Sequence, residues 1–234
     1  KLFLQACAAA MTLDMSVPQD AVAQPYPAKP VRMIVGFAVG GGTDTLARLL
    51  SKQLSGTWGQ TLVIDSRPGA DGAISTEITA KSPPDGYTIV MISNAHTITP
   101  FQRKLPYDPV KDFAPVTLVA STPNLLLVHP SLPVKSVKDL VALAKAKPGA
   151  LSFGSSGAGT SPYLAMELFK SMAGIDMAHV PYKGSGQAVI DLVGGHIQVM
   201  FGAISTTVNF VKQGKLRALA VSSRSRVASV PELP

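Results

Sequence analysis

The segment that decides the fold is Leu151-Ser-Phe-Gly-Ser-Ser-Gly-Ala-Gly-Thr-Ser-Pro-Tyr-Leu-Ala-Met-Glu-Leu-Phe-Lys170. It predicts a short strand, a turn rich in Gly and Ser, and an amphipathic helix with Leu164 and Leu168 on one face. Ser161 is expected to cap this helix and Pro162 to follow it, because Pro has no N–H to leave unpaired. Free N–H groups, the hydroxyls of the turn and the positive helix end would all favour an anion.

A second unit of the same kind lies nearer the N-terminus. Val31–Phe37 predicts a strand, Ala38-Val-Gly-Gly-Gly-Thr-Asp44 a glycine turn, and Thr45–Leu54 a helix. Each unit continues through a strand and a further glycine loop, Arg67-Pro-Gly-Ala-Asp-Gly72 in one and Lys183-Gly-Ser-Gly186 in the other. This alternation predicts parallel sheets covered by helices, and two units predict two similar lobes. Ligands bind beyond the carboxyl ends of such strands, so the glycine turns are expected to face a common cleft.

The N-terminal segment is typical of a secretory signal peptide. Lys1 precedes the apolar stretch Leu2–Leu13, and the small residues Ala21-Val-Ala23 precede Gln24. Residues 1–24 are therefore expected to be a signal peptide, incomplete at its start, which is cleaved from a soluble, periplasmic protein.

The rest of the chain divides into two lobes in this interpretation. The first lobe is expected over residues 25–122 and the second over 123–221, with Pro123 interrupting the apolar run between them. The strand predicted over Leu216–Ser222 is a candidate return crossing. Residues 222–234 would lead back toward the first lobe, whose remaining elements are expected beyond the end of this sequence.

Composition and motifs argue against several function classes. The net charge is +7, but Lys and Arg are scattered singly, so no nucleic-acid partner is expected. Neither glycine turn gives a G-x-G-x-x-G pattern, because Thr45 and Pro162 stand at the third glycine, and no cofactor is expected. The four dispersed histidines lack metal-ligand spacing, so no metal is expected. A serine hydrolase using Ser155 or Ser156 with His179 and Asp191 stays open as the alternative, although no G-x-S-x-G elbow is present.

Six segments carry a resemblance to a known family. They are Ile34-Val-Gly-Phe-Ala-Val-Gly-Gly-Gly-Thr-Asp44, Arg67-Pro-Gly-Ala70, Pro84-Asp-Gly-Tyr87, Leu105-Pro-Tyr-Asp-Pro109, Ser155-Ser-Gly-Ala-Gly-Thr-Ser161 and Val180-Pro-Tyr-Lys-Gly-Ser-Gly186. In consistent order, they resemble the tripartite tricarboxylate transporter receptors, the Bordetella-uptake-gene (Bug) type of periplasmic solute-binding protein. The resemblance implies an α/β, two-lobed periplasmic binding protein (type II-like) fold, each lobe a mostly parallel sheet flanked by helices.

The resemblance also implies a function and a site. The protein would not be an enzyme but would bind a small carboxylate, through backbone amides, hydroxyls and ordered waters, for the membrane subunits of a tripartite tricarboxylate transporter. A monomer is expected. The expected ligand-binding residues are Phe37, Ala38, Gly40, Gly41, Gly42, Thr43, Asp44, Ser93, Asn94, Ser155, Ser156, Gly157, Gly159, Thr160, Ser161 and Tyr182.

One departure from the family bears on the ligand. Gly202 stands where the family commonly has Asp, which could pair with the ammonium group of an amino acid. The predicted ligand is therefore a carboxylate without an amine, such as a dicarboxylate or an aromatic acid.

Overall fold

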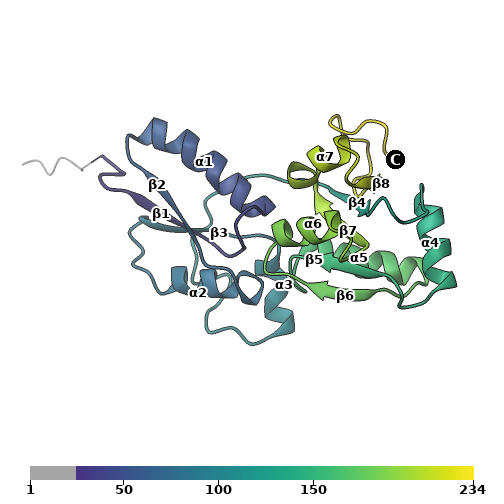
Figure 1. The fold of residues 1–234 in the computed structure, drawn as a ribbon. Coiled ribbons are helices and arrows are strands. Elements are labelled where there is room, and N and C mark those ends of the chain that lie inside the picture. The colour runs from purple at the N-terminus through teal and green to yellow at the C-terminus, as the bar shows by residue number, and fades with distance from the viewer. Residues whose placement is uncertain (1–24) are drawn as a thin grey trace, which may run out of the picture.

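A computed structural model of the protein describes residues 25–234, so the expected signal peptide lies outside the described residues. The chain forms two sheets flanked by helices, as Figure 1 shows. The strands are β1 (Val31–Val35), β2 (Leu62–Ser66), β3 (Thr88–Met91), β4 (Asn124–Val128), β5 (Ser152–Ser155), β6 (Ala178–Pro181), β7 (Val199–Ala203) and β8 (Arg217–Val221). The predicted two-lobed α/β fold is confirmed, and the two sheets with their helices are called the first and second lobe below.

The helices are α1 (Gly42–Trp58), α2 (Ala73–Ala80), α3 (Ala95–Gln102), α4 (Val137–Ala146), α5 (Ser161–Ala173), α6 (Ser185–Val193) and α7 (Ile204–Lys212), with a 3-10 turn η1 at Ala70–Gly72. In the first lobe, α1 and α2 lie on opposite sides of the sheet (Figure 1). Within residues 25–234, none of the helices is long and apolar enough to cross a membrane.

The first sheet is entirely parallel, in the order β2-β1-β3. The second has the order β6-β5-β7-β4-β8. Its strand β4 is antiparallel to both β7 and β8, and the other four strands all run in one direction. Parallel strands end at one edge of a sheet, so the loops after β1, β2 and β3 gather at one edge, as do those after β5, β6 and β7. These two edges position the candidate site.

Strand β4 explains how the second lobe buries its core. Its sequence Asn124-Leu-Leu-Leu-Val128 is almost continuously apolar, as expected for a strand covered on both faces. Leu126 packs with α4 and α5, whereas Leu125 and Leu127 pack with α6 and α7. Successive side chains of a strand point to opposite faces, so this one strand anchors both helical layers.

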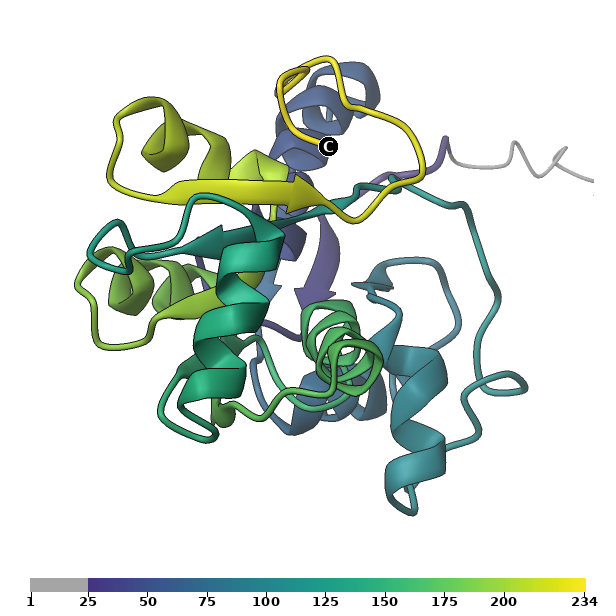
Figure 2. The ribbon, with the colours of Figure 1, turned by 90° about the vertical axis from the view of Figure 1, so that its right-hand side faces the viewer.

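The two lobes are joined by an extended connection from α3 to β4, visible on one side of the molecule in Figure 2. The expected lobe boundary at residues 122 and 123 lies within it. Strand β8, the candidate return crossing, is an edge strand of the second sheet and pairs antiparallel with β4. Beyond β8, Val221 N–H donates to the Pro234 carbonyl over 2.9 Å, which holds the last residues against the second lobe.

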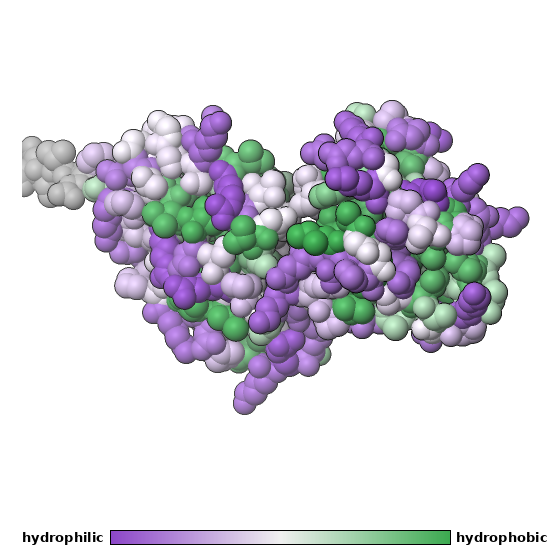
Figure 3. Space-filling model, viewed as in Figure 1, coloured by the Kyte–Doolittle hydropathy of each residue, from purple (hydrophilic) through white to green (hydrophobic). Residues whose placement is uncertain are grey.

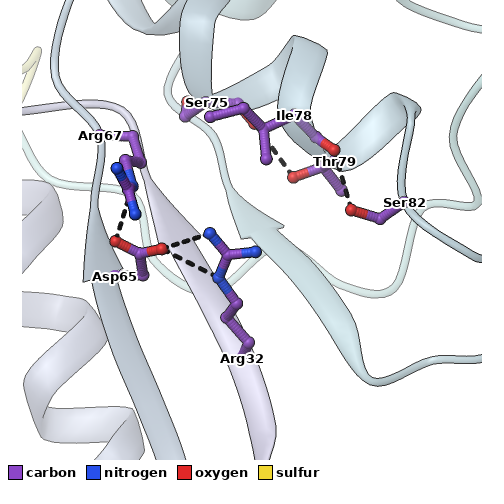
Figure 4. Close-up of polar contacts among 7 residues, drawn as sticks. All are labelled: Arg32, Asp65, Arg67, Ser75, Ile78, Thr79 and Ser82. Carbon is purple, nitrogen blue, oxygen red and sulfur yellow. Dashed lines mark hydrogen bonds and ion pairs between the residues drawn. The ribbon is translucent and has the colours of Figure 1, made fainter.

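Charged side chains fasten β1 to β2 in the first lobe (Figure 4). Asp65 accepts hydrogen bonds from Arg32 Nε at 2.9 Å and from Arg67 Nε at 2.9 Å. The hydrogen bond from Arg32 is the main reason that the pKa of Asp65 lies below its usual value. In the same view, the hydroxyls of Thr79 in α2 and of Ser82 just after it donate to backbone carbonyls of α2, so both are satisfied locally.

Candidate functional site

A cavity of about 310 Å³ lies between the two lobes. It is lined by loops that follow β1, β2, β5 and β6 and by the end of α3: Gly36, Phe37, Gly69, Ala70, Asp71, Arg103, Ser156, Gly157, Ala158, Pro181, Tyr182 and Lys183. Figure 3 shows the surface indented where the two halves of the molecule meet. The position is the one that open α/β sheets use for ligands, beyond the carboxyl ends of their strands.

The lobes touch each other beside this cavity. Ala38 N–H donates to the Lys183 carbonyl over 3.0 Å, and Gln102 Nε2 donates to the Ala158 carbonyl over 3.2 Å. All four residues belong to, or adjoin, segments that line the cavity. The structure is therefore a conformation in which the lobes are drawn together around the candidate site.

Of the hydroxyl-bearing residues expected to bind the ligand in and after the turn before α5, Ser156 lines the cavity. Ser155 Oγ accepts from Gly157 N–H over 3.1 Å and lies 2.7 Å from His179 Nε2. Thr160 Oγ1 donates to the Gly157 carbonyl over 2.7 Å. Ser155 and Thr160 are both buried, so their hydroxyls shape the turn and leave its backbone and Ser156 to face a ligand.

Helix α5 begins at Ser161, the residue that was expected to precede the helix as its N-cap. Thr160 is extended and precedes the helix, whereas Ser161 is already its first residue, so the prediction of Ser161 as the cap was wrong. Pro162 lies in the first turn, as predicted. Gly159 faces the first lobe: a Cβ there would lie 3.1 Å from Thr99 Oγ1 and 3.2 Å from Gln102 Oε1. Gly159 thus allows the lobes to meet and does not line the cavity.

The glycine turn after β1 contacts the second lobe at a different place. Helix α1 starts at Gly42, three residues before the predicted start, so Gly42, Thr43 and Asp44 form its first turn. Gly42 N–H donates to Ser185 Oγ over 3.4 Å, and a Cβ at Gly41 would lie 3.2 Å from the same oxygen. Of the residues selected from this turn, only Phe37 lines the cavity.

Asp44 supports the turn from inside. Its side chain is 2% exposed, and its Oδ2 accepts from Gly40 N–H at 3.0 Å and from Arg48 Nε at 2.9 Å. Burial opposes its ionisation most strongly, but the hydrogen bonds from Arg48 and Gly40 and the positive charge of Arg48 together outweigh burial and lower the pKa of Asp44. The carboxylate also lies in the first turn of α1, where a negative charge is favoured.

Ser93 and Asn94 lie at the start of α3. Ser93 Oγ accepts from Ala95 N–H over 3.2 Å, and Ser93 lines a smaller cavity of about 10 Å³ next to the first one. Asn94 is exposed and belongs to the lining of neither cavity.

Tyr182 forms a neutral wall of the larger cavity. Its hydroxyl donates to Asp191 Oδ2 over 2.6 Å. Burial, aided by Asp191, raises the pKa of Tyr182 to about 12. Tyr182 thus lines the cavity, while its hydroxyl proton is engaged with α6.

Sequence reasoning missed the two charged side chains of the first lobe that line the cavity. Arg103 Nη2 donates to Asp71 Oδ2 over 2.8 Å, and the side chains are 42% and 11% exposed, respectively. Asp71 lies in the glycine loop after β2. Because ligands bind beyond the carboxyl ends of parallel strands, the position of this loop could have identified Asp71 as a candidate. Arg103 follows the last residue of α3, where the sequence carried no comparable signal.

The geometry separates the residues of the alternative serine hydrolase. Ser155 and His179 are hydrogen bonded, and burial lowers the pKa of His179, which favours a neutral imidazole. Asp191, however, accepts from Tyr182, and Ser155 is 0% exposed, so this serine is closed to a substrate. Among residues 25–234, no group of three or more His, Cys, Asp or Glu side chains could hold a metal ion.

Comparison with known proteins identifies a family. Residues 46–234 match the family model described as "Tripartite tricarboxylate transporter family receptor". Protein BugT of Bordetella pertussis is 38% identical over 215 residues, which cover 91% of this chain and 66% of BugT. The chain thus spans slightly less than two thirds of this relative's length.

Two solved structures extend the comparison. The R. palustris protein Rpa4515, solved with adipate, is 39% identical with a TM-score of 0.86, over 89% of this chain and 71% of that one. MatC from Rhodopseudomonas palustris, solved with bound malate, is 31% identical with a TM-score of 0.82, over 89% of this chain and 72% of that one.

Proposed function

The chain belongs to the tripartite tricarboxylate transporter receptor family, and we propose that it is an extracytoplasmic receptor for a small carboxylate. In this proposal the exported protein closes its lobes around the ligand and delivers it to the membrane subunits of a tripartite tricarboxylate-type transporter. The observation that carries the proposal is the interlobe cavity, which joins the turn before α5 to two cationic side chains, Arg103 and Lys183.

The proposed binding surface has a simple chemistry. The backbone and hydroxyl of Ser156, with the backbone of Gly157, would hold a carboxylate near the positive end of α5. Phe37 and Tyr182 would cover the apolar part of the ligand. The other residues selected from the sequence would shape the turns and the contacts between the lobes.

The proposed ligand is a dicarboxylate, with an aromatic acid as the second choice. Two solved relatives carry adipate and malate, and both ligands have two carboxylate groups. A cavity of about 310 Å³ suits a small molecule, because ligand pockets range upward from about 300 Å³.

Thermal unfolding with and without acids tests this function. At a ligand concentration 100-fold above Kd, binding adds about 2.7 kcal/mol to the free energy of unfolding. For a chain of this size each kcal/mol raises Tm by about 2–4 °C, so adipate, succinate, malate or benzoate should raise Tm by about 5–11 °C. Failure of all four acids to shift Tm would contradict the proposal.

The same protein should not hydrolyse generic ester substrates such as p-nitrophenyl acetate. Turnover that is lost in a Ser155→Ala or Ser156→Ala variant would instead support the hydrolase alternative.

A further inference from the structure

We infer that Arg103 is the cation that binds a carboxylate of the ligand in the interlobe cavity, so that Arg103 sets a preference for dicarboxylates. The inference rests on the proposed function and deepens it. It assigns one end of the ligand to the first lobe and the other end to the turn before α5.

The position of Arg103 supports this role. The residue follows α3, and its side chain borders the cavity while remaining 42% exposed. A guanidinium has five N–H donors in a planar fork that matches a carboxylate, and the bond to Asp71 Oδ2 uses one of them. The remaining donors give the guanidinium the capacity to bind a second carboxylate.

Asp71 makes Arg103 better suited to this role than Lys183. Both cations line the cavity, but the bond to Asp71 restrains the guanidinium, whereas Lys183 is an exposed ammonium on a flexible stem. A restrained group loses less conformational freedom when a ligand binds. The first lobe thus presents a cation that is already oriented at the cavity wall.

The Asp71 carboxylate itself is poorly placed to receive an ammonium group. It is 11% exposed, and its Oδ2 is bound to Arg103. Its Oδ1 lies only 2.0 Å from where a Cβ on Gly157 would be, so this oxygen is packed against the second lobe. A ligand in the cavity therefore meets the guanidinium more readily than the carboxylate, which favours an anionic group over an amine.

The two anion-binding elements come from different lobes. Ser156 and Gly157 precede α5 in the second lobe, whereas Arg103 belongs to the first. A dicarboxylate could therefore bridge the lobes, whereas a monocarboxylate of the same length would contact one anion-binding element at a time. This difference makes the inference measurable.

Calorimetric titration of the purified chain with adipate and hexanoate tests it, because these acids have the same chain length and differ in the second carboxylate. Adipate should bind at least tenfold more tightly than hexanoate, a difference of about 1.4 kcal/mol. Arg103→Gln should weaken adipate binding at least tenfold and hexanoate binding less than twofold. Lys104→Gln, which removes an exposed cation next to Arg103 and outside the cavity lining, should change neither affinity.

Each contrary result has a distinct meaning. Adipate affinity that survives Arg103→Gln, or an equal loss for both acids in a variant with unchanged Tm, overturns the inference. Equal binding of adipate and hexanoate by the unsubstituted protein overturns it as well but leaves the proposed function in place. Binding of neither acid overturns the inference, and the proposed function falls with it when succinate, malate and benzoate also fail to bind. Tighter binding of 2-aminoadipate than of adipate would show that Asp71, and not Arg103, receives the ligand's polar group.

Discussion

Gly157→Ala tests whether ligand binding requires the turn before α5 to pack directly against Asp71 of the first lobe. Gly157 is buried and has φ +127, a conformation that side chains with a Cβ rarely adopt. An added Cβ would lie 2.0 Å from Asp71 Oδ1 and 3.1 Å from Asp71 Cγ. The first distance is shorter than any real Cβ contact and the second is tight, so Asp71 or the turn must move.

The free-energy cost of Gly157→Ala has two parts, a backbone part that Tm detects and a contact part that ligand affinity detects. The backbone part is about 1–2 kcal/mol and affects folding, so Tm should fall by about 2–8 °C. The contact part arises only when the lobes meet, and it includes the partly exposed Asp71–Arg103 ion pair, worth about 0–1 kcal/mol. With the displacement of the turn, the contact part should reach about 1–2 kcal/mol, which weakens adipate binding about 5–30-fold.

Gly174→Ala is the matched control. Gly174 also has a positive φ, +61, but nothing lies within 4 Å of its Cβ position. It should lower Tm by a similar amount and leave adipate affinity unchanged in calorimetric titration. In an Asp71→Gly background the clash partner is absent, so adding Gly157→Ala should cost less than twofold in affinity. If Gly157→Ala binds adipate as tightly as the unsubstituted protein, or its defect persists without Asp71, the contact argument fails.

Three further predictions concern stability. Asp44→Asn should cost about 1–3 kcal/mol near neutral pH, because a buried, hydrogen-bonded carboxylate is lost. Since the folded pKa of Asp44 is lowered, its contribution is present above the unfolded value of about 3.9 and is lost as pH falls through the folded value. The Tm difference between the two proteins should therefore shrink on acidification, and a constant difference from pH 7 to 3 would contradict this. Ser136→Ala removes the cap that accepts from Asp139 N–H at 3.1 Å in α4, and should lower Tm by about 2–4 °C without changing adipate affinity; an unchanged Tm would refute the cap's contribution. Gly202→Asp should destabilise the second lobe by several kcal/mol in urea unfolding, because it buries an unpaired charge, and stability equal to that of the unsubstituted protein would count against this packing.

Most of the fold could be predicted from the sequence, because its strands and helices alternate with clear periodicity. The two strand–turn–helix units were each sufficient to identify sheet elements. The apolar run interrupted by Pro123 was interpreted only as the passage between the lobes, whereas its part after Pro123 forms β4, an interior strand of the second sheet. Strand pairing was harder to predict. Arg217–Val221 is a short apolar strand whose sequence does not specify a neighbour, and its place beside β4 depends on packing across the whole second lobe.

The candidate site was predicted at the level of its sheet edges but not of its side chains. The rule about carboxyl strand ends located the loops that contain Phe37, Ser156 and Tyr182. It could not show that Ser155 is hydrogen bonded to His179, or that α1 starts at Gly42 and turns its glycines toward α6. Such details depend on hydrogen bonds and contacts between segments that are distant in sequence.

In the structure, the preference for a ligand without an amine has a different basis from the one expected at Gly202. Gly202 was expected to matter because an Asp there could pair with an ammonium group. Gly202 is in fact buried in β7, and a Cβ on it would lie 2.9 Å from Thr207 Cγ2 and 3.0 Å from Leu127 Cδ1, so the position does not line the cavity. The carboxylate that does line it is Asp71, and this carboxylate is bound to Arg103 and packed against Gly157. The proposal of a ligand without an amine therefore no longer depends on a missing acidic side chain. It depends on Asp71, whose negative charge is already paired with Arg103, and on the guanidinium of Arg103, which has further N–H donors for a ligand carboxylate.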